Sequence, residues 1–256
     1  MKQGSSKALG IIPARLESTR LPQKLLLAET GRPLLQHTWE SAQKSKTLSK
    51  LIVATDSPEI AEAVKQFGGE SYLTGDHPSG TDRIAEVIRS CDDDAGIVIN
   101  IQGDEPEINP ESIDRLVHSF DNATTAEMAT LATPILDEQT LNDPSCTKVV
   151  CGADGRALYF SRGPIPFCRD GNVRELLSGK SPWLLHIGVY AYRRDFLLRL
   201  TELPPSKLEV IEKLEQLRAL EAGATIQVEI VSEHAPGIDT PDNYANFVSR
   251  FNKTQG

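Results

Sequence analysis

The sequence predicts an α/β fold in which a mostly parallel, Rossmann-like sheet is flanked by helices. Short apolar, β-branched runs alternate with segments of helical periodicity over the first 120 residues, which is the pattern of strand–helix–strand units. These runs are nearly free of polar residues, as expected for strands covered by helices on both faces. From residue 128 onward the pattern changes to short strands and a hairpin, which indicates a smaller mixed β region.

The first half contains four expected strands, each followed by a helix. The strand at residues 8–14 is a buried run that ends abruptly in a charged loop. Ser57 is a suitable N-cap and Pro58 suits the first helical position, so a helix is expected to begin there. The further elements expected in this half are strands at 51–54, 70–73 and 96–101 and helices at 34–46, 58–67, 81–91 and 110–120.

The second half is expected to hold five strands and two helices. Residues 153–155, Ala-Asp-Gly, are typical of a hairpin turn between two of the strands. Helical spacing covers residues 208–220, with Gly223 as its stop. With neither an internal repeat nor a linker in the sequence, one continuous domain over 8–253 is expected. The strands lie at 128–134, 148–151, 157–160, 183–192 and 225–231, and the final helix at 242–251.

Composition excludes several functional classes. The 256 residues carry a formal net charge of −9 and contain no block of basic residues, so binding to polymeric nucleic acid is not expected. No apolar run approaches the roughly 18 residues of a membrane span. The first apolar run, residues 8–12, is too short for the core of a signal peptide. A cytoplasmic location without membrane association follows as the expectation.

The loop after the first strand concentrates positive charge. It places Arg15, Arg20 and Lys24 within ten residues of the end of a buried strand. Ligands of open α/β sheets bind at the carboxyl ends of strands, and arginine and lysine side chains suit phosphate oxygens. The loop is not a Walker A sequence. A phosphate-binding loop is therefore predicted, and a solvated loop with incidental charges is the alternative.

Two aspartates are candidate metal ligands. Asp104 directly follows the strand at 96–101, and Asp239 lies between an apolar stretch and the last helix. Mg²⁺ takes one or two protein carboxylates and completes its coordination with phosphates and waters. The alternative for each aspartate is a helix cap or a turn residue. Sequence spacing does not tell whether the two side chains meet.

Eight short segments of the chain together form a specific pattern, although each is a weak signal by itself. They are Ile-Pro-Ala-Arg-x-x-Ser-Thr-Arg-Leu-Pro at 12–22, Val-Ala-Thr-Asp at 53–56, Ser-Gly-Thr-Asp-Arg at 79–83, Gln-Gly-Asp-Glu-Pro at 102–106, Leu-Tyr-Phe-Ser-Arg at 158–162 with Ile-Pro at 165–166, His-Ile-Gly-Val-Tyr at 186–190, Leu-Glu-Gln-Leu-Arg at 214–218 and Gly-Ile-Asp-Thr-Pro at 237–241. In this order they resemble the segments of the 3-deoxy-manno-octulosonate cytidylyltransferases, also called CMP-Kdo synthetases. The resemblance extends from Leu9 to Phe247.

The resemblance implies a fold of the nucleotide-diphospho-sugar transferase type. Residues 160–222 would form the mixed β subregion for substrate binding and dimerisation. It also implies a homodimer that couples CTP to the acidic sugar 3-deoxy-D-manno-octulosonate (Kdo) with Mg²⁺, releasing pyrophosphate, for lipopolysaccharide biosynthesis. The catalytic residues it implies are Lys24, Asp104 and Asp239. Arg15, Arg20 and Lys24 would hold the triphosphate, Ser79, Gly80 and Arg83 the nucleotide, Asp104 and Asp239 the Mg²⁺, and Gln102, Arg162, His186, Tyr190, Glu209 and Glu212 the sugar.

Simpler interpretations exist for part of this set. His186 and Tyr190 face one side of a strand and could be packing residues. Glu209 and Glu212 could belong to a solvated helix face. Gln23 stands where the family usually has glycine, and Leu185 where it often has a basic residue.

Other functions of the same chain are also open. They are transfer to an amino analogue of Kdo, to a sialic acid or to a neutral sugar phosphate, and nucleotide sensing without catalysis.

Overall fold

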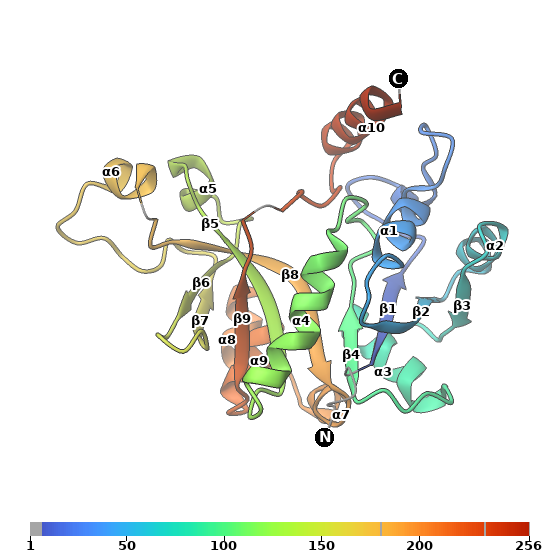
Figure 1. Cartoon of the computed structure of the whole chain (residues 1–256), viewed down its shortest axis with the longest axis horizontal. Helices are drawn as coiled ribbons and strands as arrows, with labels where there is room; N and C mark the ends of the chain where they lie inside the picture. The colour runs from blue at the N-terminus through green and yellow to red at the C-terminus, as the bar shows by residue number, and fades with distance from the viewer. Residues whose placement is uncertain (1–6, 180, 233, 256) are drawn as a thin grey trace. The chain divides into compact units, whose positions relative to one another are not determined.

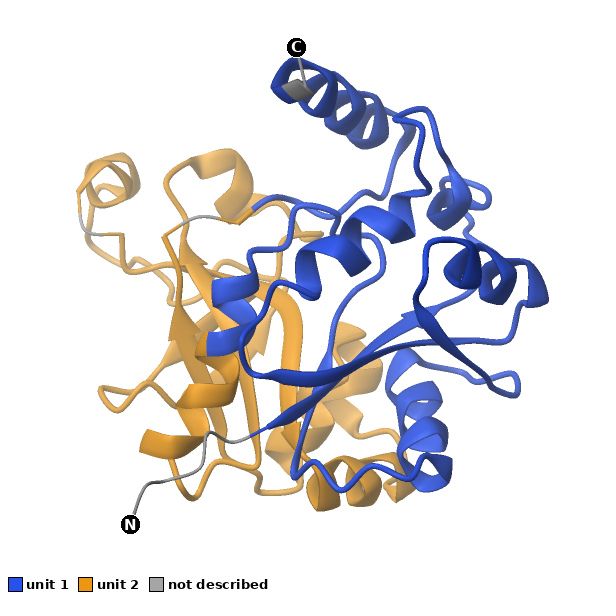
Figure 2. Cartoon of the chain, turned by 45° about the vertical axis from the view of Figure 1, so that its right-hand side comes forward, with its two compact units in different colours: residues 1–114, 235–256 blue, residues 115–234 orange. Residues whose placement is uncertain are grey.

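The computed structural model describes residues 7–179, 181–232 and 234–255 and divides into two compact units. The first unit is discontinuous in sequence: it comprises residues 1–114 and 235–256, coloured blue in Figure 2, whereas residues 115–234 form the second unit. Each unit is described by itself. The expectation of one continuous domain over 8–253 stays a prediction.

The first unit is built on four parallel strands in the order β3-β2-β1-β4. Ile11 of the central strand pairs with Ile52 on one side and with Asn100 on the other. The chain runs outward from β1 through β2 to β3 and then returns to the opposite side of β1, so β1 and β4 flank a topological switch point. The strands are β1 (Ala8–Ala14), β2 (Leu48–Thr55), β3 (Glu70–Leu73) and β4 (Ile97–Asn100) (Figure 1).

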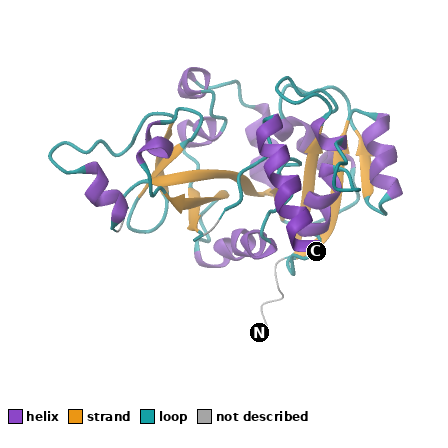
Figure 3. Ribbon diagram, turned by 90° about the horizontal axis from the view of Figure 1, so that it is seen from above, coloured by secondary structure: helices purple, strands orange, loops and turns teal. Residues whose placement is uncertain are grey.

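Helices alternate with these strands along the chain, and Figure 3 colours helices purple and strands orange. Ser57 caps α2 by accepting a hydrogen bond from the Ile60 backbone N–H, and Pro58 is the first residue of that helix, as predicted. The first helix ends earlier than expected, because the chain leaves Ala42 in tight turns through Lys44 and Ser45. The helical segments are η1 (Lys24–Leu26), α1 (Leu34–Ala42), α2 (Pro58–Gln66), α3 (Gly80–Ser90), α10 (Pro241–Gln255) and α4 (Pro110–Asn122), which crosses the unit boundary.

The second unit has a mixed sheet around β5. Strand β5 pairs antiparallel with β8 and parallel with β9, while β6 and β7 form the predicted hairpin with Gly155 at a φ of +77°. That this region is a substrate and dimerisation subregion stays a prediction. The strands are β5 (Met128–Pro134), β6 (Lys148–Cys151), β7 (Ala157–Ser161), β8 (Leu184–Arg193) and β9 (Ile226–Ile230).

The helix expected over 208–220 is wrong as a single element. Lys213 takes a left-handed conformation with a φ of 55°, which ends one helix and lets a second begin three residues later. Lysine has no special preference for this conformation, so the break leaves no mark in the sequence. The helices here are α8 (Lys207–Glu212) and α9 (Gln216–Glu221), and three further helices were not predicted: α5 (Glu138–Asn142), α6 (Val173–Ser178) and α7 (Arg194–Glu202).

The fold class is the predicted one, a mostly parallel α/β sheet flanked by helices. At the switch point of the first unit, the loops after β1 and β4 leave the carboxyl ends of neighbouring strands. These are the two loops that carry Lys24 and Asp104. Within the described residues, no helix has both the length and the apolar character needed to cross a membrane.

Candidate functional site

The structure brings all three predicted catalytic residues together in the first unit. The Lys24 ammonium donates hydrogen bonds to the Asp104 carboxylate, to Asp239 Oδ1 at 3.0 Å and to the Ile238 carbonyl at 3.0 Å. Arg20 Nη2 lies 3.0 Å from the same Asp239 oxygen. Lys24 is 80 residues from Asp104 and 215 from Asp239, so tertiary structure alone unites them. We call Arg20, Lys24, Asp104 and Asp239 the charged cluster.

Lys24 is positioned by a left-handed residue before it. Gln23 has φ 51° and ψ 29°, the conformation that glycine adopts without cost. A non-glycine residue bears roughly 1–2 kcal/mol of strain there. The short helix η1 then places Leu25 in the core while Lys24 extends toward the carboxylates. Glutamine in place of the family's glycine therefore does not prevent this left-handed turn.

Asp104 is positioned by its neighbour Gly103, whose backbone lies close to the core residue Ile12. A Cβ on Gly103 would lie only 3.3 Å from Ile12 Cγ2, so a larger residue would push the loop away from β1. The Thr38 hydroxyl donates to the Gly103 carbonyl at 2.9 Å. The next carbonyl, that of Asp104, accepts from the Ile238 N–H at 2.8 Å and so joins this loop to the segment that carries Asp239.

Asp239 is positioned by Ile238, the buried residue that precedes it. Ile238 is 1 % exposed and packs in a cluster with Leu34, Tyr244 and Phe247. The helix after it is capped by Thr240, whose Oγ1 accepts from the Asn243 N–H, while Asn243 Oδ1 accepts from the Thr240 N–H. Asp239 is thus not the helix cap. Its carboxylate is left for Lys24 and Arg20.

The donor set of the charged cluster suits a hard divalent cation. Two carboxylates meet at one ammonium group, so a positive charge already lies where their fields add. No group of three or more His, Cys, Asp or Glu side chains that could hold a metal exists in the described part of the chain. A metal on Asp104 and Asp239 would need further oxygen ligands from a phosphate or from water. That requirement agrees with Mg²⁺, which usually has few protein ligands.

Glu105, the residue after Asp104, is a buried acid that was not predicted as a site residue. It is 7 % exposed, and its Oε2 has no hydrogen-bond partner among the described residues. Burial, and secondarily the charge of Asp104, raises the pKa of Glu105 to about 8. Its carboxyl is therefore protonated near neutral pH and adds no negative charge beside the charged cluster.

Replacing Glu105 by glutamine is expected to make the chain more stable, increasingly so at high pH. The folded acid keeps its proton up to a pH of about 8, whereas an unfolded glutamate ionises at about 4.3. The stabilisation from the proton on Glu105 is therefore fully present below the pKa of the unfolded chain, and it is lost as the pH rises through the pKa of the folded protein. The gain of Glu105→Gln in the free energy of unfolding should grow by roughly 3 to 4 kcal/mol between pH 5 and pH 8.

Urea unfolding of the ligand-free wild type and variant at both pH values measures this gain. The exposed Glu111, changed to glutamine, is the matched control and should show no such growth. An equal gain for Glu105→Gln at both pH values would contradict the prediction.

The predicted nucleotide residues divide into two kinds. Ser79 caps α3 by accepting from the Asp82 N–H at 3.1 Å, and a Cβ on Gly80 would lie 3.2 Å from Pro13 of β1. The amino end of α3 thus lies against the end of β1, and the positive end of the helix dipole suits an anion there. Arg83, in contrast, is 4 % exposed and donates to Asp56 Oδ2 at 2.6 Å, so its charge is neutralised inside the protein. Arg15 is exposed on the loop after β1.

Three of the predicted sugar residues are held in networks of the second unit. Glu209 is 8 % exposed, forms the capping box of α8 with Ser206 and pairs with both Arg218 nitrogens at 2.8 and 2.5 Å, so a solvated face is wrong for it. Glu212 accepts from Ser161 Oγ at 2.7 Å and from the Arg162 N–H at 2.9 Å. Arg162 itself donates from Nε to the Glu212 carbonyl at 2.6 Å. Their role toward a sugar stays a prediction.

His186 and Tyr190 lie on one side of β8, as predicted. Their ring centroids are 5.5 Å apart, and the His186 ring also packs edge-on against Phe160. The Tyr190 hydroxyl donates to Gln216 Oε1 at 3.2 Å. Gln216 is 4 % exposed, and its Nε2 has no partner in the described part of the chain.

Gln216 was not among the predicted site residues. Its signal lay in the segment at 214–218, which was noted as a motif without singling out the amide. Gln102, also predicted for the sugar, is in the first unit after β4, where its Nε2 lies 3.5 Å from Asn100 Oδ1.

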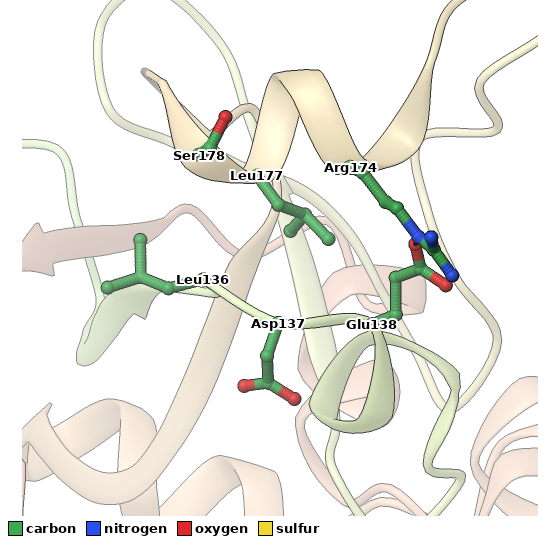
Figure 4. Close-up of a pocket in the computed structure, with 6 residues that line it drawn as sticks. All are labelled: Leu136, Asp137, Glu138, Arg174, Leu177 and Ser178. Atoms are coloured by element: carbon green, nitrogen blue, oxygen red, sulfur yellow. Dashed lines mark hydrogen bonds and ion pairs between the residues drawn. The ribbon is translucent and has the colours of Figure 1, made fainter.

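One surface hollow lies outside this set. It is formed between α5 and α6, where Arg174 Nε lies 2.8 Å from Glu138 Oε1 (Figure 4). No predicted site residue lines it. The lining residues are Leu136, Asp137, Glu138, Arg174, Leu177 and Ser178.

Comparison with known proteins defines the class and then the family. A family model described as cytidylyltransferase matches residues 9–227. The 3-deoxy-manno-octulosonate cytidylyltransferase of Rhodopirellula baltica is 50 % identical over 246 residues, covering 95 % of this chain and 98 % of that protein. That of Syntrophobacter fumaroxidans is 47 % identical over 239 residues, covering 93 % and 94 %.

A solved structure agrees with both relatives. It is that of CMP:2-keto-3-deoxy-manno-octonic acid synthetase complexed with CTP, which is 40 % identical, has a TM-score of 0.89 and is matched over 97 % of this chain and 100 % of that one. The chain belongs to the 3-deoxy-manno-octulosonate cytidylyltransferase family. The resemblance found from the eight segments is thereby confirmed.

Proposed function

We propose that the chain transfers CMP from CTP to Kdo, forming CMP-Kdo and pyrophosphate for lipopolysaccharide biosynthesis. The observation that carries the proposal is the charged cluster at the carboxyl ends of β1 and β4. It combines cations for a triphosphate with carboxylates for a metal, in a chain of this family. We also place the enzyme in the cytoplasm, where CTP is made.

The reaction is an in-line displacement at the α-phosphorus of CTP. A bond forms between the C2 hydroxyl oxygen of Kdo and that phosphorus, the bond to the β-phosphate breaks, and the hydroxyl proton is lost to solvent. Lys24 presents a compact charge, and Arg15 and Arg20 present guanidinium groups on the same loop. These cations offset the charge that develops on the departing pyrophosphate. No covalent enzyme intermediate is needed.

Asp104 and Asp239 are proposed to hold Mg²⁺. When bound, this ion supplies charge neutralisation and lowers the pKa of an attacking hydroxyl. Asp104 is fixed through Gly103 and its own carbonyl, and Asp239 through the buried Ile238, so both carboxylates are held before any ligand arrives.

The sugar is proposed to contact the second unit through His186, Tyr190 and Gln216. The Gln216 Nε2 is buried and has no hydrogen-bond partner among the residues that the structure describes, and this supports the proposal because a hydroxyl oxygen could complete its hydrogen bonding. Gln102, Arg162, Glu209 and Glu212 remain proposed sugar residues. For Arg162 and Glu209 the existing hydrogen bonds support an indirect role, in which they hold the loops around the sugar.

A homodimer is the proposed assembly. Large apolar side chains of the second unit are exposed within 160–222, where Phe167 is 81 %, Val210 51 % and Ile211 77 % exposed. Exposed apolar groups of this size are typical of protein interfaces. They support a contact with a second copy in this region.

Pyrophosphate release tests the function. Release from CTP with Mg²⁺ should require Kdo, and CMP-Kdo should accumulate in equal amount. Release that occurs only with a sialic acid, a sugar phosphate or the amino analogue of Kdo would keep the class and overturn the acceptor. CTP binding without release for any of these sugars would overturn the enzymatic proposal in favour of nucleotide sensing.

A further inference from the structure

Thr130, in the middle of β5, faces an unusual set of neighbours. The residue is fully buried, and its hydroxyl oxygen lies 3.1 Å from the Ile187 carbonyl, 2.9 Å from the Val189 carbonyl and 3.0 Å from His186 Nε2. The pairing of β5 with β8 shifts at this point: Thr130 is opposite Tyr190, whereas the next residue is opposite Ile187. The extra residues in β8 form a bulge, and bulges reorient the groups around them.

The neighbours of Thr130 decide where the proton of the His186 ring lies. A hydroxyl has one proton to donate, and two of its three neighbours are carbonyl oxygens that can only accept. The hydroxyl therefore donates to a carbonyl and is an acceptor toward the imidazole. His186 Nε2 must then carry the ring hydrogen, since an unprotonated Nε2 would leave three acceptors around one proton.

The opposite nitrogen of His186 is consequently an acceptor. In the part of the chain that the structure describes, Nδ1 has no hydrogen-bond partner. Burial, with a smaller effect of His234, lowers the pKa of His186 to about 3. The imidazole is therefore neutral at physiological pH, and Nδ1 keeps its lone pair.

We propose that Thr130 is a positioning residue that fixes His186 as the Nε2–H tautomer, so that Nδ1 accepts a hydrogen bond from a hydroxyl group of the bound sugar. The sugar part of this inference rests on the proposed function. The tautomer does not, because it follows from contacts within the second unit. Thr130 acts only through His186, and its hydroxyl lies among protein groups.

Nitrogen NMR of protein labelled at histidine tests the tautomer without any substrate. Protonated and unprotonated imidazole nitrogens have well-separated resonances, and His186→Gln identifies the signals of His186. In the wild type and in Thr130→Ser, Nε2 should be the protonated nitrogen. In Thr130→Val, which keeps the shape and loses the acceptor, the tautomers should become mixed. An Nδ1–H tautomer in the wild type, or an unchanged tautomer in Thr130→Val, would overturn the proposal.

The chain offers a matched control in the first unit. The Thr30 hydroxyl donates to the Arg32 carbonyl at 3.1 Å and lies 2.7 Å from His37 Nε2, so a threonine hydroxyl again lies between an imidazole and a carbonyl, here one carbonyl instead of two. Thr30→Val should change the tautomer of His37 and leave that of His186 and the KM for Kdo unchanged.

Steady-state kinetics test the consequence for the sugar. Thr130→Val should raise the KM for Kdo about tenfold, as expected for one lost hydrogen bond, with the KM for CTP unchanged and Thr130→Ser restoring the wild-type value. Equal rises in both KM values, or a rise that serine does not reverse, would indicate a merely structural role and overturn the proposal. A wild type inactive with Kdo would contradict the proposed function while the NMR result still decides the tautomer.

Discussion

Replacing Asp104 by asparagine is expected to lower kcat for CMP-Kdo formation by about 10³-fold, because the variant loses a carboxylate proposed to hold Mg²⁺. Asparagine keeps the size of the side chain and can still accept a hydrogen bond from Lys24, so the loop after β4 should stay folded. Pyrophosphate release at saturating CTP, Kdo and Mg²⁺ measures the loss. The loss should persist at high Kdo concentration, since the change concerns the transferring phosphate and not the sugar.

The control for Asp104 is an aspartate outside the charged cluster. Asp92 is exposed in the loop before β4, and Asp92→Asn should retain wild-type kcat. Thermal unfolding of both variants shows whether they are folded at the assay temperature. A kcat of Asp104→Asn within about tenfold of the wild type would argue against a metal on this carboxylate.

Lys24→Met is expected to separate catalysis from metal binding. The ammonium of Lys24 lies between the two carboxylates, where it would compete with a divalent cation. Removing it should tighten the binding of Mn²⁺, used as a spectroscopic substitute for Mg²⁺, by about tenfold. Removing it should also lower kcat/KM for CTP by about 10²- to 10³-fold, because a cation proposed to hold the triphosphate is lost. Electron paramagnetic resonance measures free Mn²⁺, and pyrophosphate release measures the rate.

Two results would contradict this account of Lys24. One is weaker Mn²⁺ binding in Lys24→Met, which would mean that the lysine organises the carboxylates rather than competing for them. The other is an unchanged kcat/KM for CTP. Lys65, which is exposed on α2, provides the control, since Lys65→Met removes the same charge far from the carboxylates along the chain and should alter neither quantity.

The strands could be predicted because their signals are local. β3, β5 and β6 have the predicted bounds, and Ser57 caps α2 as its position before proline indicates. The short helices α5 and α6 were missed because a helix of five or six residues has too few turns for periodicity to be visible. The split between α8 and α9 depends on the left-handed backbone conformation of Lys213, which a lysine in the sequence does not predict.

The sequence predicted which residues belong to the candidate site, but it did not predict which of their side chains contact one another. Lys24, Asp104 and Asp239 were chosen because they follow apolar runs, and the carboxyl ends of parallel strands meet at one edge. Their meeting also depends on Gly103 fitting beside Ile12, which no pattern reveals. Glu209 was misread as a possible solvated residue because its partner Arg218 is in another helix, nine residues away. Gln216 was not predicted because sequence does not show that its amide is buried, nor that its Nε2 has no hydrogen-bond partner among the described residues.

The first unit is made of two separate chain segments, and this determines when its parts appear during translation of the protein. The sheet strands and Asp104 are translated first, then all 120 residues of the second unit, and only afterwards the segment with Ile238 and Asp239. A nascent chain can therefore form the parallel sheet with Asp104 before Asp239 has been translated. If Asp104 and Asp239 hold Mg²⁺ as proposed, metal affinity is expected to appear only when translation has passed Asp239, after the whole second unit has been made.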